Sequence, residues 1–142
     1  KAWVSRCCRR TISMSEPAPG EPSLYARLGG YDAIAAVCDA LLTRLKADAQ
    51  LARFWRDRAL DSVRREQQHL VDFLCSCAGG PVYYMGRDMA TAHRGIGISA
   101  ADWNLFLGHL KAILDHFQVP PREYGEVTAF VDSLRKDCVE KA

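Results

Sequence analysis

The sequence predicts an all-α protein, and three observations support that fold class. Apolar residues recur three and four positions apart over several long segments, which is the spacing that gives a helix one buried face. No segment alternates apolar and polar residues over a useful length, so strands are not expected. Glycine pairs and a proline pair stand between the periodic segments, where they would end helices.

Three helices are expected in the first half of the folded region. Ser23 can cap a short helix over residues 24–28, which a glycine pair then ends. The next helix, over about residues 31–46, carries one continuous apolar stripe. After a short aromatic link, a third helix is expected over about residues 57–77, and a polar turn interrupts its apolar stripe.

The second half is expected to hold an irregular segment and two further helices. Residues 79–97 are rich in glycine and show no clear periodicity. Ser99 and Asp102 form a capping box that opens the next helix. The proline pair at residues 120–121 ends that helix and begins the last one. The apolar stripe of this last helix extends to Cys138.

Length and composition are those of one folded domain. The chain has 142 residues, of which 49% are hydrophobic and 25% charged, and no apolar run approaches the roughly 20 residues that cross a bilayer. Its net charge of +2 offers no basic face for nucleic acid. We therefore expect a soluble monomer of the cytoplasm or an organelle stroma, not secreted, with no membrane or nucleic-acid partner.

Residues 1–22 differ from the rest of the chain, and we expect them to form a disordered extension. Residues 1–15 are basic and residues 16–22 are rich in proline. The basic part can be interpreted as the remnant of a transit peptide or as sequence ahead of a natural start at Met14. The folded domain is expected to span residues 23–142.

The six cysteines do not suggest a zinc site. None forms a Cys-x-x-Cys pair, and Cys75 and Cys77 would point to nearly opposite sides of their helix. Cys38, Cys77 and Cys138 fall on apolar helix faces, so we expect them to be reduced residues of the core.

His93 and His69 are the candidate metal-ligating residues. His93 lies in the irregular segment, and His69 lies on the preceding helix, one turn before Phe73. Two neutral imidazoles on separate helices can bind a metal from opposite sides, and the apolar setting suggests haem. From the residues alone, two plainer interpretations stay open: His69 in a solvated turn, and His93 as an ordinary surface or core residue.

Several motifs along the chain carry a resemblance to one family. Residues 24–30 are Leu-Tyr-Ala-Arg-Leu-Gly-Gly, residues 51–55 form an aromatic bend, and residues 69–80 end in Gly-Gly. Residues 86–93 contain Gly-Arg-Asp-Met with a histidine four positions after the methionine, and residues 118–120 are Gln-Val-Pro. In this order they resemble the truncated globins, most closely group I. The resemblance implies a globin-like fold, a 2-on-2 helical sandwich around haem b.

The resemblance also implies roles for individual residues. His93 would bind the iron on the proximal side, and Arg87 would approach a haem propionate. Trp55 takes the place of the phenylalanine that stacks on the haem. The other residues that fall on haem-contact positions are Phe73, Leu74, Met89, Ile96 and Phe106.

The distal side departs from the family pattern. Leu42 stands where the family often has a tyrosine that bonds oxygen, Leu70 replaces an assisting glutamine, and Glu66 stands where glutamine or leucine is usual. A hydrogen bond to a polarised oxygen is worth roughly 1.5–3 kcal/mol, so its loss would speed oxygen escape by about ten- to a hundredfold. His69 falls where some members carry a histidine as sixth iron ligand; its other interpretation is a surface histidine over a propionate.

We therefore expect a haem protein that reversibly binds oxygen, nitric oxide or carbon monoxide. It would be an oxygen-binding or oxygen-transport truncated haemoglobin, and a hexacoordinate one if His69 and His93 both bind iron. The alternatives are a nitric oxide dioxygenase, which would need an external reductase, and an electron-transfer or redox-sensing haem protein. The fold alone does not decide among these uses.

Overall fold

The computed structural model describes residues 17–141, so most of the expected basic extension lies outside the described residues. Residues 17–22 contain a turn but no helix or strand. The only β pairing in the described part of the chain is an isolated bridge between Ser99 and Lys141. The all-α prediction is therefore confirmed. The elements are α2 (Leu24–Arg27), α3 (Tyr31–Ala47), the 3-10 turn η1 (Ala52–Phe54), α4 (Leu60–Cys77), α5 (Met89–His93), α6 (Ala100–His116), α7 (Pro121–Ser133) and α8 (Arg135–Cys138).

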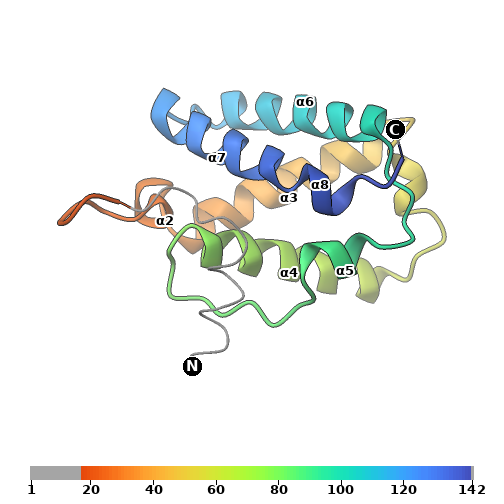
Figure 1. The fold of residues 1–142 in the computed structure, drawn as a ribbon, viewed down its shortest axis with the longest axis horizontal. Coiled ribbons are helices and arrows are strands. Elements are labelled where there is room, and N and C mark those ends of the chain that lie inside the picture. The colour runs from red at the N-terminus through yellow and green to blue at the C-terminus, as the bar shows by residue number, and fades with distance from the viewer. Residues whose placement is uncertain (1–16, 142) are drawn as a thin grey trace.

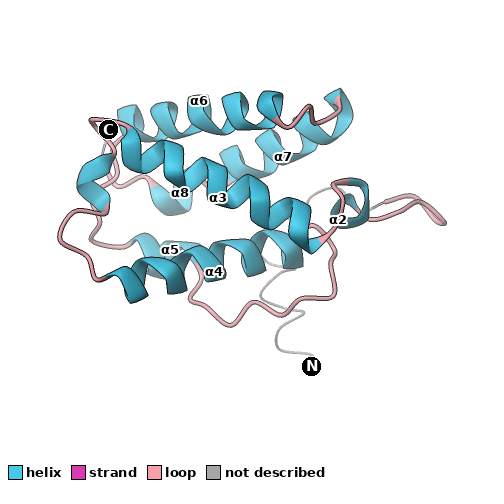
Figure 2. Ribbon diagram, turned by 180° about the vertical axis from the view of Figure 1, so that it is seen from behind, coloured by secondary structure: helices cyan, strands magenta, loops and turns pink. Residues whose placement is uncertain are grey.

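The helices form two layers with α3 between them. Figures 1 and 2 show α6 and α7 on one side of the molecule and α4 and α5 on the opposite side. Helix α3 packs against both α4 and α6, while α6 also packs against α7. The short helix α5 packs against α8. Residues of α3, α4, α5, α6, α7 and α8 all face the space between the layers.

Helix starts follow the local sequence signals. The Ser23 hydroxyl accepts a hydrogen bond from the Ala26 amide at 3.2 Å, which caps α2. The capping box of α6 is present in both directions, because the Ser99 hydroxyl accepts from the Asp102 amide and the Asp102 carboxylate accepts from the Ser99 amide. Pro121 occupies the first turn of α7. All three expected starts are confirmed.

Three expected element boundaries need correction. Helix α4 begins at Leu60 and not near Asp57, because Asp57 has a φ of 61°, which a right-handed helix does not allow. The expected last helix is divided at Leu134, whose amide bonds to the Val131 carbonyl three residues back and so tightens the turn. The irregular segment contains α5, which the Asp88 carboxylate caps through the Thr91 amide at 2.6 Å.

The close approach of α2 to the end of α4 requires glycine. A Cβ atom on Gly80 would lie 2.5 Å from the ring of Tyr25, a distance that real Cβ atoms do not show. The Tyr25 amide also donates to the carbonyl of Ala78 at 2.9 Å. The glycine pair after α4 therefore lets the chain pass directly over the aromatic ring of α2.

The core contains the four cysteines of the described residues as free thiols. Cys77 and Cys138 belong to the main apolar cluster, whereas Cys38 and Cys75 pack in a smaller cluster between α3 and α4. Burial raises the pKa of both Cys38 and Cys138 to about 12, so these thiols stay protonated and weakly reactive. The expectation of reduced core residues is confirmed, and Cys75 joins them because both sides of α4 are covered.

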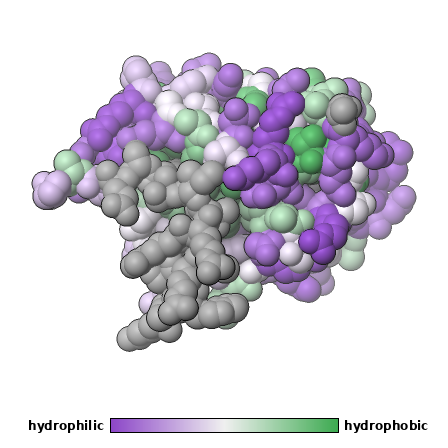
Figure 3. Space-filling view, in the orientation of Figure 1, coloured by the Kyte–Doolittle hydropathy of each residue, from purple (hydrophilic) through white to green (hydrophobic). Residues whose placement is uncertain are grey.

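The face of the molecule in Figure 3 is mainly polar. On the face shown in Figure 3, hydrophilic residues predominate and hydrophobic residues appear in small groups. No helix within residues 17–141 is long and apolar enough to cross a membrane. The large apolar side chains that are exposed among the described residues are Leu60, Tyr83, Met85, Ile96, Leu105 and Phe117.

Candidate functional site

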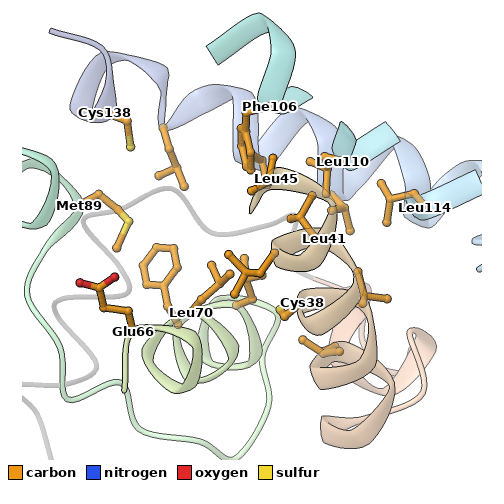
Figure 4. Close-up of a pocket in the computed structure, with 18 of the residues that line it drawn as sticks. Cys38, Leu41, Leu45, Glu66, Leu70, Met89, Phe106, Leu110, Leu114 and Cys138 are labelled. Atoms are coloured by element: carbon orange, nitrogen blue, oxygen red, sulfur yellow. The ribbon is translucent and has the colours of Figure 1, made fainter. Parts of the chain in front are cut away.

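A cavity of about 830 Å³ lies between the two layers. This volume falls within the roughly 300–1,000 Å³ of small-molecule and cofactor sites. In Figure 4, leucines from α3 and α4 and Phe106 from α6 point toward one another around the space, and the sulfur of Met89 enters it from α5. Of the candidate residues from the sequence, those that line the cavity are Leu42, Trp55, Glu66, Leu70, Phe73, Leu74, Arg87, Met89, His93, Ile96 and Phe106.

His93 is the last residue of α5 and is half-buried at the cavity wall. Its Nδ1 atom lies 2.9 Å from the carbonyl oxygen of Met89, one helical turn earlier. A carbonyl can only accept a hydrogen bond, so Nδ1 carries the proton and donates it. In the tautomer with this proton on Nδ1, Nε2 keeps the lone pair, and the hydrogen bond to Met89 fixes the ring orientation.

The cap of α5 fixes the other end of this short helix. The Asp88 carboxylate bonds to Thr91, and these hydrogen bonds hold the pKa of Asp88 below its ordinary value. Asp88 therefore stays ionised at neutral pH, where its charge also suits a helix N-terminus. A charged cap thus fixes the start of the short helix that ends at His93.

The wall formed by α3 and α4, the expected distal side, is apolar except for one ion pair. Leu42 of α3 is only 9% exposed and Leu70 of α4 is half-buried, so neither offers a hydrogen-bond donor to a ligand. Glu66 of α4 lines the cavity with the guanidinium of Arg58, which donates to both of its carboxylate oxygens. The hydrogen bond to Glu66 raises the pKa of Arg58. The Arg58 and Glu66 side chains are 31% and 48% exposed, so the ion pair adds little stability.

Arg58 is a residue that the sequence reasoning missed. It precedes α4 and reaches Glu66 across eight positions, with a further hydrogen bond to the Ser62 hydroxyl at 3.2 Å. No helical or turn motif has that spacing, so only the folded entry into α4 reveals the pair. The only hint of this ion pair in the sequence was that the link before α4 is rich in arginine.

The aromatic segment around Trp55, which lines the cavity, is attached to α6 by a buried carboxylate at the start of that helix. Asp102 is 1% exposed and accepts from Gln50 at 2.7 Å and from Arg53 of η1. Burial opposes its ionisation, but hydrogen bonds from Gln50, Ser99 and Arg53 outweigh burial and hold the pKa of Asp102 well below its usual range. Asp102 thereby fastens η1, and with it the adjacent Trp55, to α6.

His69 is not among the residues that line the cavity. Its ring meets Tyr84 edge to face, with ring centroids 6.1 Å apart, and Tyr84 in turn meets the ring of Phe73 at 5.2 Å. The Tyr84 hydroxyl donates to the backbone carbonyl of Arg87. The structure therefore brings His93 and the apolar candidates to one cavity but leaves His69 outside it.

His93 is the sole histidine among the lining residues, and residues 17–141 contain no cluster of three or more His, Cys, Asp or Glu side chains able to hold a metal ion. One imidazole holds a metal firmly only when a cofactor supplies the remaining ligands. A flat macrocycle with apolar edges suits the aromatic and aliphatic walls, and the exposed Arg87 at the cavity suits acidic substituents.

Comparison with known proteins identifies that cofactor. Residues 23–140 match the model of the family described as bacterial-like globins. A group 1 truncated haemoglobin of Mycolicibacterium paratuberculosis is 32% identical over 120 residues, which cover 84% of this chain and 83% of the relative. The structure resembles truncated haemoglobin from Tetrahymena pyriformis in its Fe(III) form, with a TM-score of 0.75, 26% identity and coverage of 84% and 100%. It also resembles THB1 of Chlamydomonas reinhardtii, with a TM-score of 0.70, 31% identity and coverage of 87% and 100%.

These relatives confirm the globin-like 2-on-2 arrangement, and their family binds haem b. The residues of this chain fit that group, because His93 offers an imidazole nitrogen at one wall and most of the other lining residues are apolar. Haem b is accordingly the cofactor. By its sequence match and by its fold, the chain belongs to the bacterial-like globins and, among them, to the group 1 truncated haemoglobins.

Proposed function

We propose that this truncated haemoglobin binds oxygen and other diatomic gases reversibly at an iron held by His93. Haem-based gas binding is the general function of the family, and the specific assignment rests on one observation. The Nδ1 atom of His93 is bonded to the Met89 carbonyl, which leaves Nε2 available to bind iron at the wall of the cavity. Bound haem supplies the ferrous iron to which a neutral gas binds.

The other residues determine how the gas is held. The aromatic and aliphatic walls limit the access of water, which slows oxidation of the iron. Leu42 and Leu70 provide no hydrogen bond to oxygen, and the Arg58 guanidinium at the cavity already donates to Glu66 and Ser62. Oxygen would therefore be retained mainly by its bond to iron, and we infer fast release.

His69 could bind the iron only after leaving its contact with Tyr84. We propose that such coordination competes with this aromatic contact and requires the His69 side chain to turn toward the cavity. Coordination would give a low-spin spectrum, and gas binding would then level off at high ligand concentration. His69→Leu should remove both effects. A wild-type ferrous spectrum that is already five-coordinate would show that His69 is not a ligand.

Repeated oxygenation of the reduced protein tests the proposal. We expect the ferrous spectrum to convert to an oxygenated form in air and to return under argon over several cycles, with carbon monoxide displacing oxygen. Oxidation of the iron at every exposure would contradict reversible binding. Rapid consumption of nitric oxide in the presence of a reductant, without reversible oxygenation, would favour a dioxygenase instead.

A further inference from the structure

The segment that follows His93 is bound to the last described residues of the chain. The Gly95 amide donates to Glu140 Oε2 at 3.1 Å, and the Gly97 amide donates to Glu140 Oε1 at 3.0 Å. Both glycines have φ near 80°, which turns the two amides toward the same carboxylate. One side chain thus holds the backbone two and four residues after the iron ligand.

Backbone hydrogen bonds continue this attachment. The carbonyl of Ile98 accepts from the amides of Glu140 at 2.9 Å and Lys141 at 3.2 Å. The Ala100 amide donates to the Lys141 carbonyl at 2.9 Å. The connection between α5 and α6 is therefore fastened along its length to residues 140–141, just after α8, the helix against which α5 packs.

Helix α5 needs such attachments because it has only five residues. A helix of that length is not stable by itself, so its position depends on its packing against α8 and on what fixes its two ends. The Asp88 cap fixes the start. At the other end, Arg94 leaves the helix with an extended backbone and is exposed, so the next anchor is the pair of glycine amides.

We propose that Glu140 is a positioning residue for His93, acting through the amides of Gly95 and Gly97 to set the alignment of the imidazole with the haem iron. The inference rests on the proposed role of His93 as the iron ligand. The ionised state that the proposal needs is present at neutral pH, because the hydrogen bonds from Gly97 and Gly95 lower the pKa of Glu140. The carboxylate accepts both amides at once, whereas a glutamine at this position has one oxygen acceptor.

The test compares Glu140→Ala and the milder Glu140→Gln with wild-type haem protein. A control variant, Glu123→Gln, weakens a buried ion pair with Arg27 at 2.7 Å, which joins α2 to α7 and includes no residue of the connection between α5 and α6. Three readouts are measured on the full chain. They are the rate of haem transfer to an excess haem-scavenging apoprotein, the amide hydrogen exchange of Gly95 and Gly97, and the iron–histidine stretching band after photolysis of the carbon monoxide complex.

We expect haem loss to become about tenfold faster in Glu140→Ala and less so in Glu140→Gln. In both variants, Gly95 and Gly97 should exchange faster and the stretching band should broaden and shift. The control variant Glu123→Gln should lower the unfolding temperature but leave the iron–histidine stretching band unshifted. A Glu140→Ala protein with wild-type haem loss, or with a wild-type band, would overturn the proposal. If His93→Ala also kept its haem, the assignment of His93 as the iron ligand would be rejected as well. If His93→Ala lost its haem, only the role of Glu140 would be rejected.

Discussion

Replacing Asp102 by alanine should destabilise the protein by about 3 kcal/mol. The change removes the acceptor of the Ser99 amide at 2.9 Å, and loss of such a helix cap costs about 1 kcal/mol. It also removes a charged acceptor from Gln50 and Arg53, and such bonds are worth about 1.5–3 kcal/mol each when buried. Because the Arg53 side chain is 42% exposed and Gln50 is exposed, water replaces much of the loss, and we count these two bonds at about 2 kcal/mol together.

Thermal unfolding of the haem protein, followed by circular dichroism, measures this effect. For a domain of this size, about 3 kcal/mol corresponds to a fall in Tm of about 10 °C. The matched control Asp115→Ala removes an exposed carboxylate from the opposite end of α6 and should change Tm little. A fall of less than about 3 °C for Asp102→Ala would refute the reasoning, because the carboxylate would then not hold η1 to α6.

The same variant should alter the dependence of stability on pH. The pKa of Asp102 is lowered in the folded state, so its stabilisation is fully present above the unfolded value of about 3.9 and is lost as pH falls through the folded value. The difference in stability between wild type and Asp102→Ala should therefore be constant near neutral pH and should shrink below about pH 4. A difference that stayed constant in acid would show that the bonds do not need the charge.

Two further predictions concern the distal wall. Leu42→Tyr should place a hydroxyl in the cavity and slow oxygen dissociation by about ten- to a hundredfold, with little change for carbon monoxide; equal changes for both gases in stopped-flow experiments would indicate altered access instead. Glu66→Gln should leave the charge of Arg58 unbalanced and raise the azide affinity of the ferric protein roughly threefold, whereas Arg58→Met should lower it by a similar factor. Optical titration measures both affinities, and shifts in the same direction would show that the pair acts as a steric barrier.

Local signals in the sequence were enough to predict most helix starts. The capping box of Ser99 and Asp102 spans three residues, and the Ser23 cap and Pro121 act within one turn, so neighbouring residues contain the whole pattern. The stops at glycine pairs are equally local. The start of α4 was placed too early because nothing in the sequence shows that Asp57 adopts a positive φ.

Interactions between distant residues could not be predicted in this way. Gln50 bonds to Asp102 across 52 positions, and Gly95 bonds to Glu140 across 45. Such partners are set by how the layers pack, which no local pattern contains. His69 illustrates the same limit on one helix, because successive residues differ by about 100° in direction and the polar turn left the orientation of α4 open. Leu70 faces the cavity, while its neighbour His69 faces Tyr84.

The central claim is that His93 alone connects the protein to the haem iron from the proximal side. His93→Gly removes the imidazole and leaves a space that free imidazole can fill, so the variant separates coordination from packing. We predict that the purified variant retains little haem, and that adding imidazole restores haem binding together with a spectrum close to that of the wild type. A variant that keeps haem without imidazole, with an unchanged spectrum, would contradict the account.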